Sequence, residues 1–198
     1  MNRNNNQQWR YKMKKKPCLC LIIGLPGSGK STLGHQLKEF LDLRRDRRNE
    51  NLTVLRETDE YFVDATTKEY KFDPSKLAEY HAECQKSTEC DLSNGVNVIV
   101  TNTNLTKWER KHYFGIARRT KCIVRIIIMR NNYGNVHGVP QEKIDQMKAK
   151  FQEVSSDEFE GIDDIRFIDA YALRKNIFNE MNFLKLMELA SNQWNGNN

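Results

Sequence analysis

A glycine-rich loop with one lysine and one hydroxyl carries the clearest chemistry in the chain. Residues 24–31 read Gly-Leu-Pro-Gly-Ser-Gly-Lys-Ser, which fits the phosphate-loop pattern G-x-x-x-x-G-K-[ST] at every fixed position. Glycines lack a Cβ, so consecutive backbone N–H groups can converge there on one anion. The lysine would bridge the outer phosphates of a nucleoside triphosphate, and the next hydroxyl would hold Mg²⁺. The loop therefore predicts binding of ATP with Mg²⁺.

The predicted nucleotide contacts lie in this loop and in the residue that follows it. They are Gly24, Pro26, Gly27, Ser28, Gly29, Lys30, Ser31 and Thr32. Lys30 is also a predicted catalytic residue, and Ser31 is the predicted metal ligand. The flanks support this reading, because an apolar run at 18–23 predicts a buried strand before the loop and apolar residues at helical spacing follow it.

The chemistry that follows phosphate binding depends on whether an acid ends the neighbouring strand. Motor and switch proteins usually place an aspartate for the metal there, whereas the apolar run at 96–100 continues into Thr101 and Asn102. Small kinases can manage with the loop hydroxyl and water, because Mg²⁺ keeps much of its hydration shell. The missing acid and the modest length of 198 residues favour a kinase.

A kinase also needs a base for the acceptor hydroxyl and a cation for the charge that develops on the transferred phosphoryl group. Four acids follow the second predicted strand, namely Glu57, Asp59, Glu60 and Asp64. Asp59 lies just past the strand end, where a side chain can face the cleft, and it is the predicted base. Arg130 begins a polar, glycine-containing loop at 130–140 and is the predicted lid arginine.

Alternating strand and helix signals surround these residues. Apolar runs predict strands at 18–23, 52–55, 96–100 and 122–129 and an edge strand at 165–169, and helical periods predict helices after the phosphate loop and at about 73–91, 106–119, 141–153 and 170–191. This order predicts an α/β fold of the P-loop NTPase kinase type, a three-layer sandwich with a parallel central sheet and helices on both faces. Ligands of such sheets lie beyond the carboxyl ends of the strands, where the candidate residues fall.

The domain organisation is inferred from charge and composition. Residues 1–16 hold six basic residues and no acid, so the rest of the chain is neutral although the whole carries a net charge of +6. We predict a basic disordered tail at 1–16, the kinase domain at 17–152, an acidic loop with a C-terminal helix packed on the domain at 153–191, and a disordered tail at 192–198. The basic tail could attract nucleic acid, direct nuclear import, or only add solubility. The absence of a recognisable signal peptide or membrane span predicts an intracellular protein, cytoplasmic or nuclear.

Several of these segments together resemble a known family. They are residues 24–32, Thr58-Asp59-Glu60-Tyr61-Phe62, Tyr70-Lys71-Phe72-Asp73-Pro74, Asn102-Thr103-Asn104, Trp108-Glu109 and His137-Gly138-Val139-Pro140. In this order they are similar to the P-loop kinases related to Nedd-four-binding protein, which in turn are similar to the kinase domain of phage polynucleotide kinase. The resemblance covers roughly residues 17–151.

The resemblance implies transfer of the ATP γ-phosphate to a 5′-hydroxyl of RNA or DNA. It puts Asp59 in the general-base position of the family, and Lys30 and Ser31 in the phosphate and Mg²⁺ positions. The residues that it places on the acceptor side are Asp59, Phe62, Asn102, Thr103 and Asn104. The chain also departs from the pattern, since Phe62 replaces an arginine that holds the acceptor phosphate in the phage enzyme. Thr101 stands where relatives often have aspartate.

Two other functions fit the same sequence. A P-loop kinase of a nucleoside, sugar or other small metabolite is consistent with the neutral charge of residues 17–198, since a polynucleotide cleft is usually basic. A nucleotide-binding interaction module without catalysis is consistent with the missing strand-end acid. An assay of phosphate transfer to oligonucleotides and to metabolites distinguishes the three.

Overall fold

The computed structural model describes residues 16–44, 51–134 and 138–169. The predicted C-terminal helix, the tail at 192–198 and all of the basic tail except Lys16 lie outside these residues. The described elements are β1 (Cys18–Gly24), α1 (Lys30–Arg44), β2 (Thr53–Arg56), the 3-10 helices η1 (Thr58–Phe62) and η2 (Pro74–Lys76), α2 (Leu77–Ser93), β3 (Asn97–Val100), α3 (Lys107–Thr120), β4 (Ile123–Met129), α4 (Gln141–Lys150), η3 (Ser156–Phe159) and β5 (Ile165–Asp169).

The strands of the described chain form one parallel sheet in the order β2-β3-β1-β4-β5. β1 lies at the centre, paired with β3 on one side and with β4 on the other, and all its residues are buried. Such a strand has no solvent-facing side, which explains its uninterrupted apolar run. The predicted parallel sheet is confirmed, as is the predicted strand at 165–169, which forms one edge.

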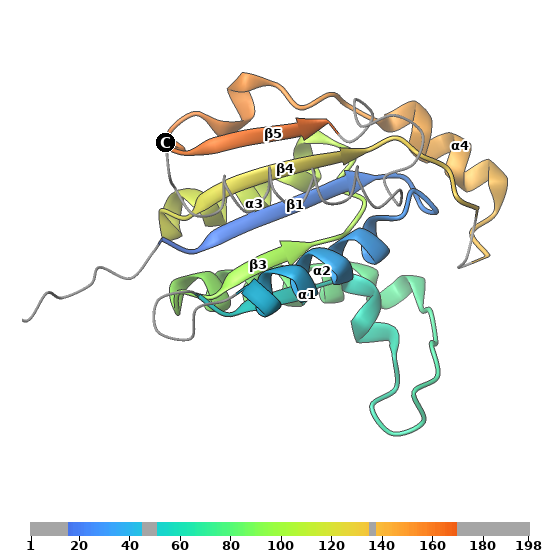
Figure 1. The fold of residues 1–198 in the computed structure, drawn as a ribbon. Helices are drawn as coiled ribbons and strands as arrows, with labels where there is room; N and C mark the ends of the chain where they lie inside the picture. The colour runs from blue at the N-terminus through green and yellow to red at the C-terminus, as the bar shows by residue number, and fades with distance from the viewer. Residues whose placement is uncertain (1–15, 45–50, 135–137, 170–198) are drawn as a thin grey trace, which may run out of the picture.

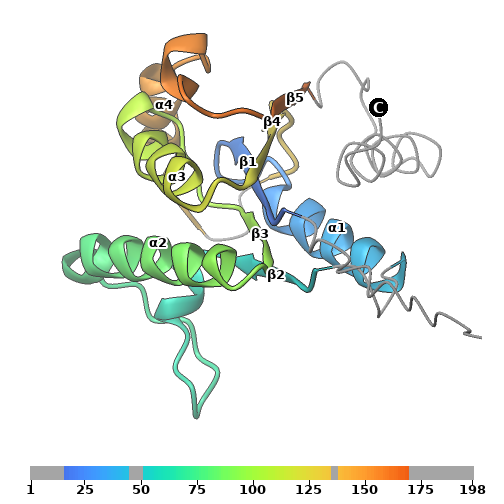
Figure 2. The same cartoon turned by 90° about the vertical axis from the view of Figure 1, so that its left-hand side faces the viewer.

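Helices cover both faces of the sheet, so the molecule has three layers (Figure 1). Successive side chains of β1 point to opposite faces: Cys20 and Ile22 join the core under α1, whereas Leu21 and Ile23 join the core under α2 and α3. Figure 2, which looks along the sheet, shows α1 on one side and α2 with α3 on the other. The predicted three-layer α/β architecture is confirmed.

The helix predicted to start near Asp73 begins later than expected. The Asp73 carboxylate does accept a hydrogen bond from the Ser75 backbone N–H at 2.8 Å, as an N-cap should, but residues 74–76 form a 3-10 turn and α2 proper starts at Leu77. By contrast, α3 carries the predicted capping box, in which Thr106 and Glu109 bond each other's backbone N–H groups. α4 ends at Lys150, three residues before the predicted end.

The segment between η1 and η2 projects away from the body of the molecule. It folds back through an isolated antiparallel bridge between Val63 and Tyr70, and Figures 1 and 2 show it extending beyond the sheet and helices. The Asp64 carboxylate organises its tip by accepting hydrogen bonds from the Thr66 and Thr67 backbone N–H groups, both at 2.8 Å. We refer to residues 63–72 as the projecting loop.

Among the described residues, no helix combines the length and the apolar character that a bilayer crossing requires.

Candidate functional site

The phosphate loop joins the carboxyl end of β1 to the start of α1 and is tightly packed against β4. A Cβ on Gly24 would lie 2.6 Å from the Met129 carbonyl oxygen, so a larger residue has no room there. Gly27 and Gly29 have φ values of 75° and 88°, which side chains disfavour. Ser28 is 1% exposed, and its Oγ has no hydrogen-bond partner within the described part of the chain. A buried polar atom without a partner in such a loop indicates a place for a ligand atom.

The Lys30 side chain folds back on the phosphate loop and is buried there. Its Nζ donates to the Leu25 carbonyl oxygen at 2.8 Å, and the residue is 8% exposed. Burial lowers the pKa of Lys30 to about 8, against the opposing effect of the Glu57 and Asp59 carboxylates. These acids therefore lie close enough to Lys30 to act on its charge.

Asp59 lies on η1, directly after β2, and is exposed. Its carboxylate accepts a hydrogen bond from the Tyr70 hydroxyl of the projecting loop, and it opposes the lowering of the His81 pKa, which burial causes. Asp59 and Lys30 thus lie at the same carboxyl edge of the sheet, close enough for the acid to act on the pKa of the lysine. Its role as the base stays a prediction.

Asn102 joins the ends of two neighbouring strands. Its Oδ1 accepts from the Thr58 backbone N–H at 2.8 Å, and its Nδ2 donates to the Tyr113 hydroxyl at 3.0 Å. Asn102 is 9% exposed, so these protein contacts occupy the amide that the resemblance places on the acceptor side. The geometry assigns it a positioning task, because Thr58 immediately precedes Asp59.

Thr103 of the Asn-Thr-Asn segment lies against the phosphate loop, and Asn104 follows it in a left-handed backbone conformation. The Thr103 carbonyl oxygen accepts from the Gly24 N–H at 3.2 Å. Asn104 has a φ of 47° and is 4% exposed, and its Nδ2 finds no hydrogen-bond partner among the described residues. Asn104 is therefore the member of the segment whose side-chain amide is left for a ligand.

Phe62 belongs to an aromatic cluster made with Tyr70, Phe72 and Tyr80. Its ring centroid lies 5.0 Å from that of Phe72 and 4.8 Å from that of Tyr80, and the residue is 4% exposed. Phe62 thus packs the base of the projecting loop, whereas Tyr70 and Phe72, which are 44% and 53% exposed, present ring surface to solvent. Sequence reasoning missed Tyr70 and Phe72 as site residues, although both lie in a segment that the resemblance includes.

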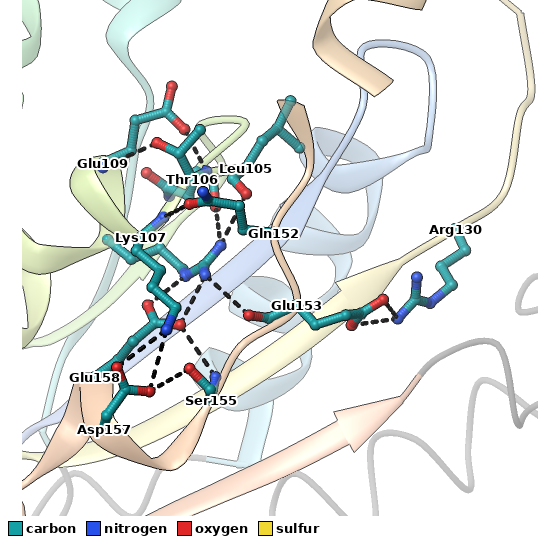
Figure 3. Close-up of polar contacts among 12 residues, drawn as sticks. Leu105, Thr106, Lys107, Glu109, Arg130, Gln152, Glu153, Ser155, Asp157 and Glu158 are labelled. Carbon is teal, nitrogen blue, oxygen red and sulfur yellow. Dashed lines mark hydrogen bonds and ion pairs between the residues drawn. The ribbon is translucent and has the colours of Figure 1, made fainter. Parts of the chain in front are cut away.

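Arg130 lies at the carboxyl end of β4 and does not point freely into solution. Its Nη2 donates to both carboxylate oxygens of Glu153 at 2.8 Å (Figure 3). Its guanidinium also lies 5.3 Å from the centre of the Phe151 ring. The loop that it begins does touch the phosphate loop, where the Tyr133 N–H donates to the Gly27 carbonyl oxygen at 2.9 Å. A catalytic role for Arg130 would require release from Glu153 and remains a prediction.

Residues 151–159, here called the strap, are tied to the start of α3. Arg110 is fully buried, and its guanidinium donates to both carboxylate oxygens of Glu158 at 2.8 Å and to the Leu105 carbonyl oxygen at 3.0 Å. Figure 3 shows Glu158, Asp157 and Gln152 of the strap gathered around residues 105–107. The strap therefore fixes the segment that follows Asn104.

The described residues include no group of three or more His, Cys, Asp or Glu side chains that could hold a metal ion. Mg²⁺ that binds together with a nucleotide takes most of its oxygen ligands from the phosphates and from water. Ser31 in the first turn of α1 offers the hydroxyl that such a complex uses.

Comparison with known proteins agrees with this description. Residues 19–132 match the AAA domain family. NEDD4-binding protein 2 of Homo sapiens is 31% identical over 144 residues, which are 68% of this chain and only 8% of the length of that relative.

Solved structures share the fold at low identity. Kti12 of Chaetomium thermophilum, in complex with ADP-AlF3, has a TM-score of 0.61 at 13% identity, covering 88% of this chain and 98% of its own. The Mycobacterium tuberculosis APS kinase CysC, in complex with AMPPNP and APS, has a TM-score of 0.51 at 10% identity, covering 87% and 97%. The molecule has a P-loop kinase-like fold.

Proposed function

The chain belongs to the AAA domain family, and from that premise we propose that it is a kinase that transfers the γ-phosphate of ATP to a 5′-hydroxyl of RNA or DNA. The observation that carries the proposal is the placement of Lys30 and Asp59. The lysine lies within the phosphate loop after β1, and the acid follows β2, two strands away in the sheet, yet it lies close enough to influence the pKa of the lysine.

Nucleotide binding rests on the loop and its unpaired atoms. The backbone N–H groups around Gly27 and Gly29, the Ser28 hydroxyl and the N-terminus of α1 all suit an anion. Two proteins of similar fold, Kti12 and the APS kinase CysC, were solved with ADP-AlF3 and with AMPPNP, which supports the same use of the loop here. Burial of Lys30 fits as well, because phosphates would add counter-charge to that of Glu57 and Asp59 and so stabilise the charged lysine.

In the proposed reaction the acceptor oxygen attacks the γ-phosphorus while the bond to the bridging oxygen of the β-phosphate breaks. Asp59 accepts the proton of the acceptor hydroxyl, and ADP leaves with the bridging oxygen. Lys30 holds the phosphates as charge moves onto the leaving group. Mg²⁺, when bound at Ser31, supplies charge neutralisation on the β- and γ-phosphates.

The aromatic surface beside Asp59 favours an acceptor that carries a base. Tyr70 contacts Asp59 directly, and Phe72 lies two residues further along the projecting loop with half of its surface exposed. Nucleobases stack on exposed aromatic rings at roughly 1–3 kcal/mol per base. An inorganic acceptor would gain little from this surface, whereas the terminal nucleotide of an RNA or DNA strand could use it.

Two alternatives remain, each with its own supporting observation. A small-molecule kinase is supported by the neutral net charge of residues 17–198. A nucleotide-binding module without catalysis is supported by the pairing of Arg130 with Glu153, which leaves the proposed lid cation neutralised.

The deciding experiment uses labelled ATP with matched RNA and DNA oligomers that carry a 5′-hydroxyl. We expect label at the 5′ end, and we expect K30A and D59N each to reduce the rate by about 100-fold or more, the usual scale for loss of such groups. E83Q removes an exposed acid of α2 and serves as a control that keeps the wild-type rate.

The outcomes separate the three functions. Transfer to a metabolite but to neither oligomer would assign the small-molecule alternative. ATP binding without transfer to any acceptor would assign the interaction module. Transfer that D59N leaves unchanged would remove Asp59 as the base.

A further inference from the structure

Glu57, an acid that follows β2, contacts the residue at which β3 ends without an acid of its own. Glu57 directly follows β2, and its carboxylate accepts a hydrogen bond from the Thr101 hydroxyl, at the position where β3 ends without an aspartate. Thr101 is 4% exposed and its backbone N–H bonds the Arg56 carbonyl oxygen at 3.3 Å, so its side chain is firmly placed.

Thr101 also lies against the helix that carries the metal-binding hydroxyl. A Cβ on Gly34 of α1 would come within 2.7 Å of the Thr101 methyl group, so the backbone of α1 packs closely against the Thr101 side chain at this point. Gly34 lies one helical turn after Ser31. Thr101 therefore binds Glu57 and lies against α1, the helix whose first turn carries Ser31.

The negative charge of Glu57 near the phosphate loop would favour binding of a divalent cation together with the nucleotide. Glu57 acts on the pKa of Lys30 more strongly than Asp59 does, which puts two carboxylates near one lysine. A triphosphate adds several negative charges to the same space, and carboxylate and phosphate oxygens repel each other strongly at short range. Mg²⁺ between them turns this repulsion into attraction, because carboxylates and phosphates are the oxygen ligands that it binds.

We propose that Glu57, held by Thr101, is the acid that faces the hydration shell of the nucleotide-bound Mg²⁺ in place of the missing aspartate at the end of β3. The proposed acid follows β2, the strand that pairs with β3. The proposal needs only nucleotide binding by the phosphate loop and does not depend on which acceptor is phosphorylated.

The test measures ATP affinity by calorimetry in Mg²⁺ and in EDTA, and takes the ratio of the two dissociation constants as the magnesium ratio. E57Q keeps the shape of the side chain and an oxygen that can accept from Thr101, so only the charge is lost. We expect the magnesium ratio to fall roughly 10–100-fold, the usual effect of removing an outer-shell partner of a metal. Affinity in EDTA should stay the same or improve, because a repulsive charge is gone.

Two further variants keep the test specific. D59N removes the other acid near Lys30 and should keep the wild-type magnesium ratio. In the double variant E57Q/T101D the carboxylate returns to the end of β3 and should restore the ratio. Circular dichroism and thermal unfolding establish that each variant is folded.

Each result decides the matter. A wild-type magnesium ratio in E57Q, or an equal loss in E57Q and D59N, would overturn the assignment of Glu57, as would failure of T101D to restore the loss. If the wild-type protein binds no ATP in either buffer, the proposed kinase function fails as well. Loss of the inference alone would leave ATP binding intact.

Discussion

The residue whose ionisation most directly reports on this site is Lys30. Burial lowers its pKa from 10.5 to about 8, whereas in the unfolded chain it keeps the ordinary value. Between these two pH values the unfolded chain therefore binds more protons than the folded one. The contribution of Lys30 to the stability of the nucleotide-free protein accordingly rises with pH across this window.

Phosphates should reverse this shift, since they stabilise the charged lysine. We predict that ATP binding at pH 9 takes up about one proton, and that affinity falls as pH rises above about 8, where the free protein loses that proton. Calorimetry in buffers of different ionisation enthalpy measures the uptake. K30M should abolish it, and equal uptake in K30M and wild type would show that another group titrates.

Single residues also show where sequence reasoning reaches its limit. The phosphate loop could be predicted residue by residue because its fixed positions are contiguous. Asn102 and Arg130 were identified as site residues, but their contacts could not be predicted. Asn102 bonds the backbone of Thr58 and Arg130 bonds Glu153, partners that are 44 and 23 residues away in sequence. Such contacts depend on which strands lie side by side.

At the scale of elements, the contact between α1 and the ends of β2 and β3 depends on one glycine. A Cβ on Gly34 would lie 2.7 Å from the Thr101 methyl group and 2.8 Å from a methyl of buried Leu55. We predict that G34A lowers the free energy of unfolding by about 1–3 kcal/mol, because overpacking outweighs the better helix propensity of alanine. Urea denaturation measures the change.

Gly115 of α3 supplies a matched control for this prediction. Its Cβ would meet only the end of the Arg119 side chain, at 3.3 Å, and that side chain is 60% exposed. G115A should therefore raise stability by about 0.5–1 kcal/mol, the gain expected in a helix interior. Equal effects of G34A and G115A would contradict the packing argument.

The strap gives a second comparison between neighbouring acids. Glu158 is 5% exposed and pairs with fully buried Arg110, whereas Asp157 is 68% exposed and pairs with Lys107. We predict that E158Q costs about 3–5 kcal/mol, because it leaves a buried guanidinium without its counter-charge. D157N should change the unfolding midpoint little, since water screens an exposed pair. Similar midpoints for both variants would show that the buried pair does not stabilise the strap.

The types of the helices and strands were predicted more accurately than the residues at which they begin and end. The strands could be predicted because a parallel sheet covered on both faces demands continuous apolar runs, as in β1 and β4. The 3-10 helix η1 was missed, although it carries the proposed base. Its conformation depends on the Asn102 amide, which bonds the Thr58 N–H from the neighbouring strand end. No local sequence pattern in residues 58–62 predicts that contact.

At the scale of the whole molecule, the net positive charge comes from one short part of the sequence. Residues 1–16 hold six basic residues, and the remaining chain is neutral. If that segment attracts nucleic acid, deletion of residues 2–15 should weaken oligonucleotide binding and flatten its dependence on salt. The logarithmic slope should change by up to about 0.9 for each phosphate that the shortened protein no longer neutralises. Fluorescence anisotropy of a labelled oligomer across a salt series measures the slope.

The deletion should leave the folded unit intact, because it stops short of Pro17, whose carbonyl oxygen accepts from the Ile123 N–H at 2.8 Å. Affinity for ATP is the control and should not change. Unchanged slopes for the oligonucleotide would favour the alternative that this segment only adds solubility.

The hydrogen bond from Tyr70 to Asp59 has a further consequence for the proposed reaction. The Tyr70 phenol already bonds the carboxylate that would accept the proton of the acceptor alcohol, so acceptor binding would exchange one hydroxyl for another. A hydrogen bond to a charged group contributes about 1.5–3 kcal/mol. A molecule that offers Asp59 only one such bond therefore gains no free energy over the Tyr70 hydroxyl that it displaces. Water offers only this hydrogen bond, whereas a nucleotide gains additional binding free energy by stacking on the aromatic rings. Tyr70 would thus make water a poor competitor for Asp59 and so limit hydrolysis of ATP.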